Sequence, residues 1–80
     1  MIEAYEDDPR LERYLITFQQ GETIFLEGDE SQDLYVLLEG ELDVLKGDQV
    51  ISILSGPEAV FGEMSFLMGD KRTASIRARS

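Results

Sequence analysis

The residues best suited to chemistry lie near the end of the chain, in the segment from Phe61 to Ser80 that reads FGEMSFLMGDKRTASIRARS. Gly62 and Glu63 precede an apolar run, Met64 to Met68, which fits about one and a half turns of helix. The first N–H groups of a helix lack internal partners and lie at its positive end, so they favour a bound phosphate. Gly62 has no Cβ, which lets the backbone approach a ligand closely. These residues predict a phosphate site at the start of a short helix.

Arg72 is the second component of this site. Gly69-Asp70 predicts a turn that ends the helix and leads into a strand from Arg72 to Arg79. Side chains alternate along a strand, so Arg72 shares the apolar, inward face with Ala74, Ile76 and Ala78. A buried unpaired charge is very costly, and the guanidinium fork suits either a carboxylate or a phosphate. Its expected partner is therefore either Glu63 or a bound anion.

Glu63 would repel a phosphate if both groups acted on the same part of a ligand. The Glu63 carboxylate and a phosphate are compatible in one site if the carboxylate accepts a hydrogen bond from a sugar hydroxyl while the neighbouring N–H groups hold the phosphate. Arg72 would then compensate the phosphate charge. The expected ligand therefore carries a phosphate and a sugar hydroxyl.

This segment resembles the phosphate-binding cassette of the cyclic nucleotide-binding domain family, found in bacterial regulators, cyclic-nucleotide-dependent kinases and gated channels. The family pattern is Phe-Gly-Glu, a short apolar helix, a variable turn and Arg-Ser/Thr-Ala. The matching residues here are Phe61-Gly62-Glu63, Met64 to Met68 and Arg72-Thr73-Ala74. Further matches upstream are Gly21-Glu22, Gly28-Asp29, Tyr35 to Leu38 and Gly40, so the resemblance covers residues 15–80.

The resemblance implies a role for each residue of the cassette. A 3′,5′-cyclic nucleotide is the implied ligand, with cyclic AMP favoured over cyclic GMP, and no cofactor is implied. Its phosphate would be held by the side chains of Arg72 and Thr73 and by the backbone of Gly62, Met64 and Ser65. The small side chain of Ala74 would leave room for the phosphate. The Glu63 carboxylate, beside Gly62, would take the ribose 2′-hydroxyl.

Elsewhere the chain predicts a mainly β fold. Short segments rich in β-branched and aromatic residues recur roughly every 8 to 12 residues with turns between them, which is typical of a sandwich or barrel. They are Arg13 to Phe18, Thr23 to Leu26, Leu34 to Leu38, Glu41 to Leu45 and Val50 to Leu54. The family fold is a β-roll of jelly-roll type. We expect residues 1–11 to form a loose acidic arm and residues 12–80 to form the roll.

The resemblance also implies elements beyond Ser80, because the family domain adds one more strand and helices that close over the base. Their absence predicts an exposed sheet edge at residues 73–79, open to self-association as a homodimer. Two alternatives remain: a fragment of a larger regulator, or a short protein completed by another copy. An effector domain or partner protein would lie outside this chain.

Composition limits the function. The 80 residues carry 17 acidic and 7 basic side chains, a net charge of −10, which disfavours nucleic-acid binding. The chain contains no run of about 18 apolar residues, so we expect no membrane-spanning helix. The chain has no cysteine and no histidine, so we expect no zinc or similar metal site, no enzymatic activity and a cytoplasmic location.

One alternative from another functional class remains open at this point. In it, Arg72 pairs with Glu63 as a buried structural ion pair. The β-roll then binds no nucleotide and serves as a structural or self-association module.

Overall fold

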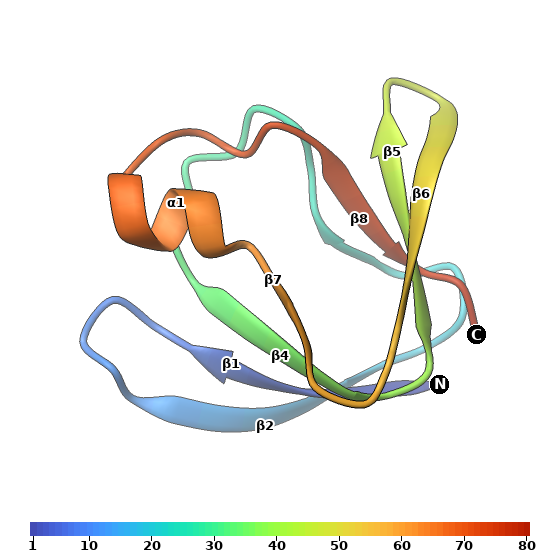
Figure 1. Cartoon of the computed structure of the whole chain (residues 1–80), viewed down its shortest axis with the longest axis horizontal. Coiled ribbons are helices and arrows are strands. Elements are labelled where there is room, and N and C mark those ends of the chain that lie inside the picture. The colour runs from blue at the N-terminus through green and yellow to red at the C-terminus, as the bar shows by residue number, and fades with distance from the viewer.

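Eight short strands and one helix make up the chain, and the computed structural model describes all of them, over residues 1–80 (Figure 1). The strands are β1 (Ile2–Asp7), β2 (Arg13–Phe18), β3 (Thr23–Phe25), β4 (Leu34–Glu39), β5 (Glu41–Lys46), β6 (Gln49–Ser55), β7 (Ala59–Phe61) and β8 (Ser75–Ala78), and the helix is α1 (Glu63–Met68). The helix is too short to cross a membrane.

The strands form two antiparallel four-stranded sheets, with strand orders β2-β1-β4-β7 and β3-β8-β5-β6. Apolar side chains from both sheets make the core, including Leu37 of the first sheet and Leu42 of the second, both fully buried. Eight strands in two packed sheets are the arrangement of a jelly roll. The predicted mainly β fold with a short helix is confirmed.

Glycines set the tight connections between strands. Gly40 joins β4 to β5 with φ 103°, a left-handed conformation that costs other residues energy. It also lies against Ile2, so a Cβ at this position would collide with that side chain. The β4–β5 turn thus leaves room for the first strand of the chain.

Two predictions about the ends of the chain are wrong. Residues 1–11 are not a loose arm: residues 2–7 form β1, an inner strand that pairs with both β2 and β4. Its alternating Ile2 and Ala4 are fully buried, which is the physical reason that this acidic segment is ordered. The predicted exposed edge at residues 73–79 is also absent, because β8 pairs with β3 on one side and β5 on the other.

Strand positions were otherwise close to those expected from the sequence. The strand predicted from Arg72 begins at Ser75, since residues 72–74 run past the helix in an irregular conformation. β7, a strand of three residues that leads directly into Gly62, was not predicted. This short strand pairs with β4 and so fixes where the helix begins.

Candidate anion-binding site

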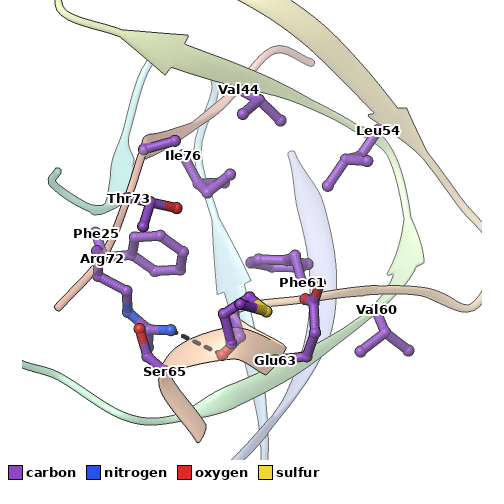
Figure 2. A pocket seen from close by; sticks show the side chains of 13 residues that line it. Phe25, Val44, Leu54, Val60, Phe61, Glu63, Ser65, Arg72, Thr73 and Ile76 are labelled. Atoms are coloured by element: carbon purple, nitrogen blue, oxygen red, sulfur yellow. Dashed lines mark hydrogen bonds between the residues drawn. The ribbon is translucent and has the colours of Figure 1, made fainter. Parts of the chain in front are cut away.

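One cavity of about 220 Å³ lies between the two sheets and the start of α1 (Figure 2). Thirteen residues line it, and Glu63 and Arg72 are the only charged ones. All seven residues that the sequence suggested for the site are among them, namely Gly62, Glu63, Met64, Ser65, Arg72, Thr73 and Ala74. The fold therefore brings together the two ends of the predicted cassette.

The Arg72 guanidinium is the central group of this cavity. The residue is only 3% exposed. Its Nε donates to Ser31 Oγ at 3.1 Å, its Nη1 to the Gly62 carbonyl at 3.0 Å and its Nη2 to the Asp33 carbonyl at 2.8 Å. These three neutral acceptors come from two separate loops, so the guanidinium is held in one position before any ligand arrives.

No carboxylate pairs with this buried cation. None of the seven ion pairs of the chain includes Arg72, and in Figure 2 the Arg72 and Glu63 side chains lie on opposite sides of the helix start. The structure therefore does not contain the Glu63–Arg72 ion pair that the alternative interpretation requires. The Phe25 ring, 4.0 Å from Arg72 Cζ, supplies a cation–π contact instead.

Burial changes the electrostatics of the Arg72 guanidinium. It lowers the pKa of Arg72 from its usual value, because the charged form loses hydration. Arginine nevertheless stays protonated, and its five N–H donors exceed the three hydrogen bonds that it makes. Two N–H donors thus have no hydrogen-bond partner in the structure, and no carboxylate lies within ion-pair distance of the guanidinium.

Gly62 permits the close contact between helix and arginine. Its φ of 81° is left-handed, and α1 begins at the next residue. A Cβ at Gly62 would lie 2.7 Å from Arg72 Nη1 and 2.9 Å from the Asp33 carbonyl oxygen. Glycine is required here both for the backbone angle and for the space that the guanidinium occupies. The helix ends as predicted, at Gly69, whose N–H donates to the Ser65 carbonyl.

The other basic residues near the C-terminus do not reach the cavity. Arg77 and Arg79 point to the opposite face of β8, where they bind the Asp43 carboxylate at 3.2 and 2.9 Å. Asp43 is 5% exposed, and these arginines, Arg79 first, hold the pKa of its carboxyl below the usual value. Arg72 alone therefore supplies positive charge to the cavity.

A second polar cluster, missed in the sequence, lies behind the arginine. The Tyr35 hydroxyl donates to Glu6 Oε2 at 3.1 Å, and the Tyr35 ring stacks on Phe61 with centroids 4.9 Å apart. A hydrogen bond with the Asp33 carboxyl, followed by desolvation, raises the pKa of Glu6 to about 7. Nothing in the sequence distinguishes Glu6 from its acidic neighbours, because its partners come from β4 and the residues before it.

The fold and the cavity define a β-roll with a buried arginine, without a carboxylate partner, at the start of its helix. The cyclic nucleotide-binding domain model matches residues 15–80, and the chain belongs to this family. Human cGMP-dependent protein kinase 2 is 36% identical over 61 residues, which are 76% of this chain and 8% of the kinase. The chain thus spans a small part of that relative. No solved structure matched.

Replacing Glu6 with glutamine tests the carboxyl cluster. A raised folded-state pKa means that the stability from Glu6 is full below about 4.5 and is lost as pH rises through about 7. Glutamine mimics the protonated acid and avoids this loss. We expect Glu6→Gln and the parent to unfold at similar temperatures at pH 5. At pH 8 the variant should unfold several degrees higher, since roughly 1 kcal/mol corresponds to about 4–8 °C.

The control for this measurement is Glu3→Gln, which removes a carboxylate from the same strand. It should leave the parent's dependence of melting temperature on pH unchanged. Equal effects of the two substitutions, or a lower melting temperature for Glu6→Gln at pH 8, would show that Glu6 does not hold a proton in the folded state.

Proposed function

We propose that this chain is a non-enzymatic regulatory module that binds a 3′,5′-cyclic nucleotide in the Arg72 cavity. The observation that carries the proposal is the buried Arg72 guanidinium, which has three neutral acceptors and no carboxylate. A cyclic phosphodiester bears one negative charge, so it neutralises this cation without leaving an excess charge. Family membership supports the same ligand class.

In this proposal the phosphate lies between Arg72 and the start of α1. The two remaining guanidinium donors bind its oxygens, and the N–H groups of Glu63, Met64 and Ser65, which have no partner within the helix, add further donors. Thr73, an exposed residue at the cavity, offers a hydroxyl, and Ala74 limits the bulk beside the phosphate.

The ribose and base would occupy the rest of the cavity. Glu63 lies away from Arg72, which suits a carboxylate that accepts the 2′-hydroxyl and does not face the phosphate. Val44, Leu54 and Ile76 form an apolar side opposite the arginine, where a purine would pack (Figure 2). A volume of about 220 Å³ is below the 300–1,000 Å³ typical of ligand pockets, so part of the base would remain outside.

The proposal also covers which base the site prefers and how nucleotide binding acts on an effector. Cyclic AMP is the proposed ligand, whereas the kinase relative is named for cyclic GMP, so both ligands belong in the binding measurements. Binding would tighten the loop and helix around the phosphate and bias an effector domain or partner protein. The absence of cysteine and histidine supports a non-catalytic role, and the absence of cysteine is compatible with the proposed cytoplasmic location.

Removing the arginine should abolish most of the affinity. Truncating one partner of a desolvated charge pair costs about 2–5 kcal/mol. We therefore expect Arg72→Ala to weaken cyclic AMP and cyclic GMP binding by at least about 30-fold, measured by isothermal titration calorimetry. The matched control is Lys71→Ala, which removes an exposed cation from the adjacent position. Equal affinities for Arg72→Ala and the parent, with a folded amide spectrum, would refute the site.

Glu63 can be tested with a modified ligand. If its carboxylate accepts the ribose hydroxyl, Glu63→Gln and the use of 2′-deoxy cyclic AMP should each weaken binding by roughly tenfold, because a hydrogen bond to a charged group contributes about 1.5–3 kcal/mol. Combined, they should weaken it little more than either alone. Fully additive losses would mean that Glu63 does not contact the 2′-hydroxyl.

A further inference from the structure

The first strand lies outside the part of the chain that matches the family, yet it is central to one sheet. The family match begins at residue 15, whereas β1 spans residues 2–7 and pairs with β2 and β4. Ile2 and Ala4 are fully buried, and Ile2 belongs to the main apolar cluster. Figure 1 shows β1 running between its two neighbours. Residues 15–80 alone therefore lack the strand that joins β2 to β4 in this sheet.

Without β1, the space between β2 and β4 would be a slot for one strand. The two strands do not pair with each other. Neighbouring strands lie about 4.8 Å apart, so β2 and β4 are separated by roughly twice that distance, too far for direct hydrogen bonds. Unpaired backbone groups in the middle of a sheet are costly, and a strand that fills the slot satisfies them. We call this space the β1 slot.

Specific contacts give the β1 slot selectivity for the β1 sequence. Asp7 accepts two hydrogen bonds from the Arg13 guanidinium, at 2.7 and 2.9 Å, and the same guanidinium lies 4.8 Å from the centre of the Tyr5 ring. Gly40 leaves space for the Ile2 side chain. A strand that fits must therefore carry an apolar residue, a tyrosine and an aspartate at the spacing of β1.

The connection that keeps β1 in its own slot is short and exposed. Five residues, Asp8 to Glu12, separate β1 from β2, and Leu11 adopts φ 65°, an unfavourable left-handed angle for a leucine. Asp8 Oδ1 accepts hydrogen bonds from the N–H groups of Arg10 and Glu12, which hold the loop closed. Short hinge loops under strain favour the exchange of the attached element between molecules.

From these features we infer that the β1 slot is a strand-binding site and that β1 of a second copy of this chain is its occupant. In the exchanged pair each copy makes every β1 contact with its partner, and the hinge opens so that Leu11 leaves its strained conformation. Each chain carries a net charge of −10, so the copies repel one another. Added salt screens this repulsion and should favour exchange.

Disulfide trapping in the 80-residue chain tests this inference directly, because the chain has no cysteine of its own. Glu3 of β1 lies opposite Thr17 of β2. Opposed residues in antiparallel strands have Cα atoms about 4.5–5.5 Å apart, which suits a disulfide. A Glu3→Cys chain and a Thr17→Cys chain would be mixed at high concentration and oxidised. We expect a covalent heterodimer, whose yield increases with salt.

The control pairs the Glu3→Cys chain with an Asp48→Cys chain, because Asp48 lies in the exposed β5–β6 turn. A Glu3/Thr17 heterodimer no more abundant than this control would overturn strand exchange. Deleting Pro9 to Glu12 gives a second test, since one remaining residue cannot reverse the chain between adjacent strands. This variant should be a folded dimer of twice the 9.0 kDa monomer mass. A folded monomer, or a chain that fails to fold, would equally refute the inference.

Discussion

The whole site depends on one constraint, the burial of the Arg72 guanidinium without a carboxylate. Burying a cation is costly unless its hydrogen bonds are satisfied, and two loops distant in sequence supply the acceptors. Gly62 must lack a side chain, and the Phe25 ring must lie beneath the charge. The resulting position is fixed by the fold, so an incoming anion does not have to order the arginine.

Charge elsewhere in the molecule is arranged so that this cation remains unpaired. Arg77 and Arg79 share Asp43 on the outer face of β8, and the neighbouring Asp33 carboxyl raises the pKa of Glu6 behind the cavity. Because the chain as a whole is strongly acidic, long-range attraction does not bring an anion to the site. Affinity for the proposed nucleotide would therefore come from short-range contacts in the cavity.

The cassette could be predicted from the sequence because its residues are close in the chain and its physical requirements are local. The glycine before a short helix was found where expected, and Arg72 is buried as expected, although it lies in the irregular segment before β8 and not on the strand. The arginine's acceptors could not be predicted, because Ser31 and Asp33 contribute through a loop that only the fold brings near. The role of residues 2–7 was missed for a similar reason: this acidic segment becomes a strand only because two other strands leave a place for it.

The most direct test of the central claim is an amide proton–nitrogen correlation spectrum of the 80-residue chain during titration with cyclic AMP, extended to the Arg72 Nε–H group. If a phosphate binds at the unpaired guanidinium, shifts should concentrate on residues 62–65 and 72–74, and the Arg72 Nε–H resonance should move with the same binding curve. A well-dispersed spectrum that does not change at millimolar cyclic AMP would contradict the account.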